Sequence, residues 1–382
     1  MRIGLVAGEA SGDVLGAGLI REFKKRVPNA EFFGVAGPLM AAEGCEVWAE
    51  SETLAVMGLV EPLKVLPELL RLRRDLLERW SGQRPHAFVG IDAPEFNLGL
   101  ARRLRHRGIR TVQYVSPQLW AWRQGRVRTI GRAVNQVLCL LPFEKDFYDR
   151  FGVSAEVVGH PLADNLPSDL RRDAVRQELG LEDGRVVAVL PGSRSGEVER
   201  LGPVFAATAR QILAEDTSVS FVAPMANLAA RNGFERCLSA EGVEEEFMLT
   251  DGGATEAIVA ADVVLLASGT ASLQTALLKR PMVSAYRVAS LTYHLAQLFR
   301  LLKVPHFTMP NLLTDEPLVP EFLQDAATPD ALAGALLALM NDEGRRHHIE
   351  TTFAELRLRL ALGADQRAAA AVEALAAEAQ YA

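Results

Sequence analysis

Two turns in the second half of the sequence carry residues suited to binding phosphate. Ser193 and Arg194 lie in a Pro-Gly-Ser-Arg turn that follows the apolar run Val186–Leu190. Glycine permits a tight turn, the N–H groups at a helix start bind anions, and the arginine fork fits phosphate oxygens. The alternative is an ordinary strand-to-helix turn in which Arg194 forms a surface ion pair.

The second turn is made of small residues and follows the run Val263–Leu266. It contains Ser268, Gly269 and Thr270, and a helix is expected to begin directly after it. The first N–H groups of that helix have no partner within the helix and lie at the positive end of its dipole. The alternative is a simple Ser/Thr helix cap. Together the two turns predict a site for a nucleotide diphosphate.

A possible general base follows a strand in the first half of the sequence. Asp92 comes directly after the run Ala87–Ile91, where a carboxylate can accept a proton from a hydroxyl. Pro94 is expected to hold Ala93 in an extended conformation, which would keep this carboxylate away from the next helix. The alternative is that Asp92 caps that helix.

Three other features have less specific signals. The loop Gly8–Asp13 lacks the GxGxxG spacing and the P-loop lysine, so its signal for a dinucleotide is weak, and binding of a polar group opposite the nucleotide is equally consistent. Trp120 and Trp122 follow another strand, and they either stack on a ligand or pack internally. His160 is a hinge or turn residue, and no histidine spacing is typical of a metal site.

Short β-branched runs alternate with helical patterns, as expected for parallel β/α units. The predicted strands are Arg2–Ala7, Glu31–Val35, Ala87–Ile91, Thr111–Val115, Gln136–Leu140, Glu156–Val158, Val186–Leu190, Val219–Ala223, Phe247–Thr250, Val263–Leu266 and Met282–Ala285. The pattern breaks at 159–168, so we predict two doubly wound α/β domains, 1–165 and 166–345. The Ala-rich segment 346–382 is expected to be helical and to pack back on the first domain. Ligands of such sheets bind beyond the carboxyl ends of the strands.

Composition excludes several classes of protein. The 382 residues are 49% apolar and 23% charged, which is typical of a globular chain and not of a disordered one. A net charge of −7 gives no global attraction for nucleic acid. The three cysteines are far apart, and we expect them to be reduced thiols. No signal peptide or membrane-spanning run is expected, although the basic, leucine-rich segments Thr53–Trp80 and Leu291–Val304 are typical of a membrane surface or of core-facing helices.

The ordered set of motifs resembles the bacterial lipid-A-disaccharide synthases over nearly the whole chain. The motifs are GEASGD (8–13), MGLVEPL (57–63), IDAPEFN (91–97), YVSPQLWAW (114–122), LPFE (141–144), GHPL (159–162), LPGSR (190–194), ASGTASLQTAL (267–277), PMVSAYR (281–287) and PNLL (310–313). The resemblance implies a GT-B glycosyltransferase with two facing Rossmann-like domains, the first binding the acceptor and the second the UDP-sugar. It also implies an inverting transfer of 2,3-diacylglucosamine from UDP to 2,3-diacylglucosamine 1-phosphate, giving the β-1,6 disaccharide 1-phosphate and UDP.

The resemblance also implies residue roles and partners. Asp92 would be the base and Arg194 would contact the diphosphate. The other implied UDP-site residues are Ser193, Ser268, Gly269, Thr270, Gln274 and Asn311, and Ser11, Asp13 and Trp120 would lie toward the acceptor. No cofactor or resident metal is implied. The family usually has Glu at position 274 and Asp at position 95, where this chain has Gln274 and Glu95.

The implied location is the cytoplasm, with peripheral association at the anionic surface of the inner membrane and a homodimer as one assembly. Two alternatives stay open at this point. A UDP-N-acetylglucosamine 2-epimerase shares the fold and needs no lipid acceptor. A non-catalytic UDP- or lipid-binding relative is favoured only by Gln274, which lacks the charge of Glu.

Overall fold

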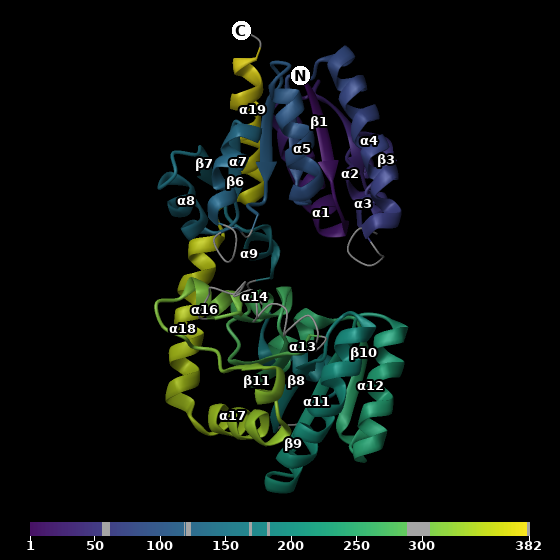
Figure 1. Cartoon of the computed structure of the whole chain (residues 1–382). Helices are drawn as coiled ribbons and strands as arrows, with labels where there is room; N and C mark the ends of the chain where they lie inside the picture. Colours follow the sequence, from purple (N-terminus) through teal and green to yellow (C-terminus); the bar gives the residue numbers. More distant parts are fainter. Residues whose placement is uncertain are drawn as a thin grey trace. The chain divides into compact units, whose positions relative to one another are not determined.

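The chain divides into two compact units (Figure 1). A computed structural model describes residues 1–55, 62–117, 119, 124–167, 170–181, 184–288 and 306–379. Unit 1 consists of Met1–Asp164 and Leu360–Ala382, and unit 2 of Asn165–Arg359. Each unit contains one parallel sheet flanked by helices, which confirms the predicted α/β class.

Unit 1 contains a seven-stranded sheet in the order β3-β2-β1-β4-β5-β6-β7. Its strands are β1 (Arg2–Ala7), β2 (Glu31–Ala36), β3 (Cys45–Glu50), β4 (Ala87–Ile91), β5 (Arg110–Tyr114), β6 (Gln136–Cys139) and β7 (Ala155–Val157). Every neighbouring pair is parallel. The central strands are buried along their whole length, because helices cover both faces of the sheet.

The helices of unit 1 form two layers over this sheet. They are α1 (Ala10–Arg26), α2 (Pro38–Ala42), α3 (Glu52–Ala55), α4 (Pro62–Gln83), α5 (Pro94–Arg105), the 3₁₀ turn η2 (Gln124–Arg126), α7 (Val127–Ala133), α8 (Pro142–Asp149), α9 (Pro161–Asn165) and α19 (Ala364–Glu378). One core layer joins the sheet to α1 and α19, with Phe23 and Val372 buried. The other joins it to α4, α5 and α7, with Trp80 and Leu100 buried.

Unit 2 has a six-stranded parallel sheet in the order β10-β9-β8-β11-β12-β13. Its strands are β8 (Arg185–Leu190), β9 (Val219–Met225), β10 (Phe247–Asp251), β11 (Val263–Ala267), β12 (Met282–Tyr286) and β13 (Glu321–Leu323). Its helices are α10 (Arg172–Leu179), α11 (Ser195–Glu215), α12 (Leu228–Glu241), η3 (Glu244–Glu246), α13 (Ala254–Ala260), α14 (Thr270–Leu277), α16 (Met309–Leu313), η4 (Gln324–Ala326), α17 (Pro329–Asn341) and α18 (Glu343–Leu360).

The end of the chain is helical, as expected, and its last two helices belong to different units. The structure groups α18 with unit 2 up to Arg359, whereas α19 packs against α1 of unit 1 (Figure 1). The apolar face of α19 is made mainly of alanines, such as Ala368 and Ala369, which let the two helices approach closely. No helix in the described part of the chain is both long enough and apolar enough to span a bilayer.

Asp13 holds the start of α2 in place. Its buried carboxylate accepts hydrogen bonds from the backbone N–H groups of Gly37 (2.9 Å), Leu39 (2.9 Å) and Met40 (3.0 Å). These groups belong to a helix start, whose donors have no partner within the helix. The Asp13 carboxylate is thus satisfied inside the fold, and its place on the acceptor side stays a prediction.

We expect Asp13→Ala to destabilise unit 1, because three donors would lose their charged acceptor. The free energy of unfolding should fall by about 3 kcal/mol in urea denaturation followed by circular dichroism. Asp149→Ala, which removes an exposed carboxylate paired with Lys145, is the matched control and should change little. Equal losses in the two variants would contradict this role for Asp13.

Candidate functional site

The loops after β1 and β4 meet at the carboxyl edge of the unit 1 sheet. These strands are neighbours, with Ala7 opposite Ile91. The chains approach so closely that a Cβ atom on Gly8 would lie 2.3 Å from the Cβ of Ala93. Only glycine fits there, so the close approach of the two loops depends on Gly8.

Asp92 occupies a strained turn between β4 and α5. Its φ is +51° and that of Ala93 is +41°, so both residues are left-handed. The prediction of an extended Ala93 before Pro94 is therefore wrong. The amides of Asn97 (2.8 Å) and Gln113 (3.0 Å) both donate to the Asp92 carbonyl and hold the turn. Left-handed non-glycine residues cost about 1–2 kcal/mol each and are concentrated at functional sites.

The environment of Asp92 favours its protonated form. Burial is the main cause that raises the pKa of its carboxyl group, and the negative charge of Glu9 is the next. The N–H of Ala93 opposes this rise, while Glu95 and a hydrogen bond with Glu9 add to it. A carboxylate with a raised pKa is a stronger base, so Asp92 is suited to taking a proton from a hydroxyl group.

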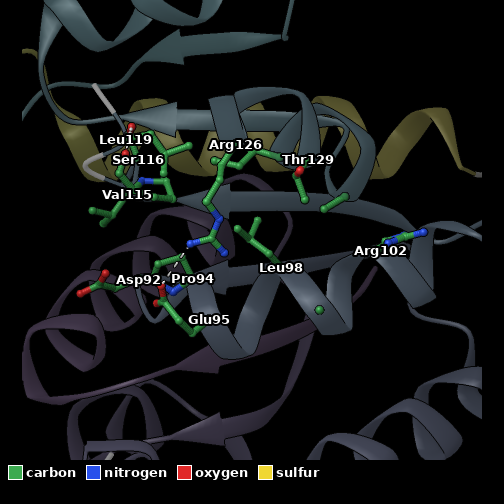
Figure 2. A pocket seen from close by; sticks show the side chains of 14 residues that line it. Asp92, Pro94, Glu95, Leu98, Arg102, Val115, Ser116, Leu119, Arg126 and Thr129 are labelled. Atoms are coloured by element: carbon green, nitrogen blue, oxygen red, sulfur yellow. Dashed lines mark hydrogen bonds and ion pairs between the residues drawn. The ribbon is translucent and has the colours of Figure 1, made fainter. Parts of the chain in front are cut away.

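A cavity of about 530 Å³ begins at Asp92 and runs between α5 and α7 (Figure 2). Its lining combines apolar residues with charged and hydroxyl side chains and consists of Asp92, Pro94, Glu95, Leu98, Gly99, Arg102, Val115, Ser116, Pro117, Leu119, Arg126, Thr129, Ile130 and Ala133. An ion pair of 3.8 Å joins Arg126 to Glu95 beside Asp92. A cavity that combines apolar surface with a small number of polar and charged groups is typical of a small-molecule site.

The other residues predicted in unit 1 have different surroundings. Ser11 is exposed, and its hydroxyl donates to Glu9 (3.0 Å). Trp120 and Trp122 lie outside the described residues. His160 is a turn residue: its Nδ1 accepts from the N–H of Leu162 (3.2 Å), and burial lowers its pKa to about 4, so the imidazole is neutral at pH 7.

The two phosphate-binding turns predicted in unit 2 line one cavity of about 490 Å³. They come together because β8 and β11 are neighbours, with Leu190 opposite Leu266. The cavity is lined by Leu190, Gly192, Ser193, Arg194, Glu197, Pro224, Met225, Ala226, Gly252, Ala254, Ala267, Ser268, Gly269, Thr270, Ala271, Gln274 and Tyr286. All the predicted UDP-site residues except Asn311 are among them.

The first turn already binds a carboxylate from its own chain. Glu197 accepts hydrogen bonds from the N–H groups of Ser193 (3.0 Å) and Arg194 (3.3 Å), and it pairs with the Arg194 guanidinium at 3.2 Å. The N–H groups of Ser193 and Arg194 are therefore not free in this state. Arg194 itself is 73% exposed and forms the surface ion pair of the alternative interpretation. An entering phosphate would take over the donors that Glu197 now occupies.

In the second turn, no N-cap side chain occupies the N–H groups at the start of α14. Gly269 is the N-cap of α14 and provides no side-chain hydrogen bond. Gln274 is held by a hydrogen bond of 3.1 Å from its amide to the Thr255 hydroxyl. Asn311 lies elsewhere: it is buried and pairs with Val319 through both its amide nitrogen (2.8 Å) and its oxygen (2.9 Å). This pairing makes Asn311 a structural residue in this state.

The sequence did not predict two carboxylates of these sites, Glu9 and Glu197. Glu9 lies beside Asp92, and its only signal is that it follows a strand next to β4 in a doubly wound sheet. Glu197 follows Arg194 by three residues, a spacing typical of a capping box, in which the N3 carboxylate reaches back to the backbone of the cap. Within the described residues, no cluster of three His, Cys, Asp or Glu side chains could hold a metal ion.

Comparison with known proteins identifies the family. The model of the lipid-A-disaccharide synthetase family matches residues 3–375. This chain belongs to that family. The lipid-A-disaccharide synthase of Alkalilimnicola ehrlichii is 54% identical over 379 residues, covering 98% of this chain and 99% of its own. That of Serratia proteamaculans is 49% identical over 377 residues, covering 98% of both chains.

Solved structures show the same fold at low identity, and the two units have the GT-B architecture. A putative UDP-N-acetylglucosamine 2-epimerase from Listeria monocytogenes has a TM-score of 0.65 at 12% identity, covering 100% of this chain and 96% of its own. The calicheamicin glycosyltransferase CalG4 has a TM-score of 0.62 at 17% identity, covering 98% of both chains. These two proteins share one fold but carry out different reactions. Their likeness to this chain therefore shows the architecture alone.

We expect Glu9→Gln to lower the pKa of Asp92, because it removes a neighbouring negative charge. Burial should keep that pKa above the ordinary aspartate value, which a pH titration of the Asp92 carboxyl carbon by NMR can measure. Glu46→Gln, an exposed carboxylate of β3, is the control and should leave the titration unchanged. An unchanged Asp92 titration in the Glu9 variant would show that the two carboxylates do not interact.

Proposed function

We propose that this chain transfers 2,3-diacylglucosamine from UDP to the 6-hydroxyl of 2,3-diacylglucosamine 1-phosphate, with inversion at the anomeric carbon. The products are the β-1,6-linked disaccharide 1-phosphate and UDP. Family membership over residues 3–375 supports the reaction. The observation that carries the mechanism is the half-buried Asp92, which lies in a strained turn and lines the edge of a cavity.

In the proposed mechanism, Asp92 takes the proton of the acceptor 6-hydroxyl. The acceptor oxygen then forms a bond to the donor C1 as the bond between C1 and the diphosphate oxygen breaks. The electron pair of that bond leaves with UDP. Attack on the face opposite the leaving group inverts the configuration at C1. The raised pKa of Asp92 matches the role, because proton transfer is most effective when the pKa of the base approaches the working pH.

The negative charge that develops on UDP requires donors in the cavity of unit 2. Arg194 and the N–H groups at the start of α14 are the donors present there. We propose that the diphosphate displaces Glu197 from the first turn and takes over Arg194. Donors fixed where charge develops contribute several kcal/mol to catalysis, so the proposal uses no resident metal ion or cofactor.

The epimerase alternative is less favoured. The likeness to epimerases is structural and stands at 12% identity, whereas lipid-A-disaccharide synthases match at about half of all positions. The apolar residues of the cavity beside Asp92, among them Leu98, Leu119 and Ile130, also suit contact with the acyl chains of a lipid substrate.

We also propose that the chain works at the surface of the cytoplasmic membrane. On α4, Leu66 and Leu70 are each 46% exposed, and Arg71 and Arg74 are exposed beside them. Apolar residues flanked by cations are typical of helices that lie on anionic lipid surfaces. This feature supports peripheral attachment, through which lipid substrates would reach the enzyme.

The direct test of the reaction is incubation with UDP-2,3-diacylglucosamine and 2,3-diacylglucosamine 1-phosphate, followed by mass spectrometry of the lipids. The proposal expects a disaccharide 1-phosphate that forms only when both substrates are present. Conversion of the UDP-sugar in the absence of acceptor would favour the epimerase. UDP binding without any product would favour a non-catalytic protein.

Asp92→Asn should lower kcat by about a hundredfold to ten-thousandfold, because an amide cannot accept the proton. In the unsubstituted protein, kcat/KM should rise with pH through the raised pKa of Asp92, since the base works only when deprotonated. The same substitution at the exposed Asp149 is the control. A variant at position 92 that is folded and fully active would exclude Asp92 as the base.

Arg194→Gln should weaken UDP binding by about tenfold or more in calorimetry, because a charged donor to the diphosphate is lost. Arg236→Gln removes an exposed arginine from α12, outside the cavity, and should bind UDP normally. Identical affinities for the two variants would place the diphosphate elsewhere.

A further inference from the structure

A second hollow in unit 1 is strongly basic. It has a volume of about 390 Å³ and is lined by Arg73 of α4 and by Gly99, Arg102, Arg103 and His106 of α5 and the turn after it. Within the described part of the chain, none of the three arginine side chains forms an ion pair or a hydrogen bond. Like charges gathered without counter-charges repel one another, so this arrangement favours an anionic ligand.

Arg73 is the least satisfied member of this cluster. Its Nε atom is buried and has no hydrogen-bond partner among the described residues. Its guanidinium lies 5.9 Å from the centre of the Phe96 ring, so it is held against α5. Burial and the charge of Arg103 lower the pKa of Arg73. A half-buried cation without a partner carries a desolvation cost that a bound anion would offset.

The hollow is shaped by a glycine. A Cβ atom on Gly99 would lie 2.5 Å from Nη1 of Arg73, so a larger residue would push the guanidinium away from α5. Alanine is favoured over glycine inside a helix by about 1 kcal/mol, so helix propensity does not explain this residue. Gly99 therefore allows the position that Arg73 takes in the hollow.

We propose that this hollow binds the phosphate of an anionic membrane phospholipid. Arginine clusters recognise phosphate through charged, bidentate hydrogen bonds. The exposed leucines Leu66 and Leu70 lie about two turns and one turn, respectively, before Arg73 on α4, which places apolar contacts for a lipid next to the cations. The inference rests on the proposed attachment to the membrane and names the group that recognises the lipid.

Gly99 and Arg102 line both this hollow and the cavity that begins at Asp92, so the two adjoin along α5. Arg102 lies about 12 Å along the axis of α5 from Pro94, and its side chain points away from Asp92 (Figure 2). Six bonds separate the 6-hydroxyl oxygen of a glucosamine 1-phosphate from its phosphorus, a span below about 9 Å. We therefore assign a phosphate held by Arg73 and Arg103, which line the hollow alone, to another molecule.

Co-sedimentation of the full chain with vesicles tests the proposal. The probes are phosphatidylcholine vesicles with and without phosphatidic acid, and inorganic phosphate is titrated separately by calorimetry. Gly99→Ala displaces Arg73 without changing any charge, and Arg103→Gln removes one exposed arginine of the hollow. The matched controls are Gly82→Ala, at an open position of α4, and Arg236→Gln, an exposed α12 arginine outside the hollow. Circular dichroism confirms that each variant is folded.

We expect tighter binding to the vesicles that contain phosphatidic acid, with affinity reduced about tenfold in Gly99→Ala and Arg103→Gln and less in the controls. Equal effects in the hollow and control variants would show diffuse charge attraction and overturn the proposal. If Gly99→Ala and Arg103→Gln weakened the binding of inorganic phosphate but left vesicle binding unchanged, the hollow would bind free phosphate, and the assignment to a phospholipid would be overturned. Asp92→Asn should bind vesicles normally, so failure of glycosyl transfer and failure of this inference are distinguishable.

Discussion

Parallel pairing of strands in register is the constraint on which both candidate sites depend. Pairing of β1 with β4 places Ala7 opposite Ile91, and pairing of β8 with β11 places Leu190 opposite Leu266. Because these strands end at the same level, the residues that follow them must share one edge of each sheet. This constraint brings Asp92 beside the loop after β1 in unit 1, and it brings the two phosphate-binding turns together in unit 2.

Both sites use carboxylates to set the state of the groups beside them. In unit 1, burial and Glu9 raise the pKa of Asp92, and a left-handed turn holds its carboxylate at the cavity. In unit 2, Glu197 satisfies the donors of the first turn. Glu9 thus makes Asp92 a stronger base, and Glu197 occupies donors that a phosphate could bind in its place. Strain and charge are thus concentrated at the positions where the proposed chemistry needs them.

The sequence predicts most of the architecture, because buried parallel strands are continuous apolar runs. The strands that the sequence did not predict are β3, an edge strand whose short apolar run Val47–Ala49 is flanked by Glu46 and Glu50, and β13, which has only three residues. The two turns and Asp92 were found because they follow strong strand signals. Local sequence patterns do not encode contacts between distant segments. Such contacts determine the conformation of Ala93, the pairing of Asn311 with Val319 and the position of Glu9 beside Asp92.

A crystal structure of the chain with UDP bound tests the central claim most directly. The account predicts the diphosphate in the cavity of unit 2, bound by Arg194 and by the N–H groups at the start of α14, with Glu197 displaced from the turn. The account would be contradicted if the diphosphate lay outside this cavity and Glu197 kept its hydrogen bonds to Ser193 and Arg194.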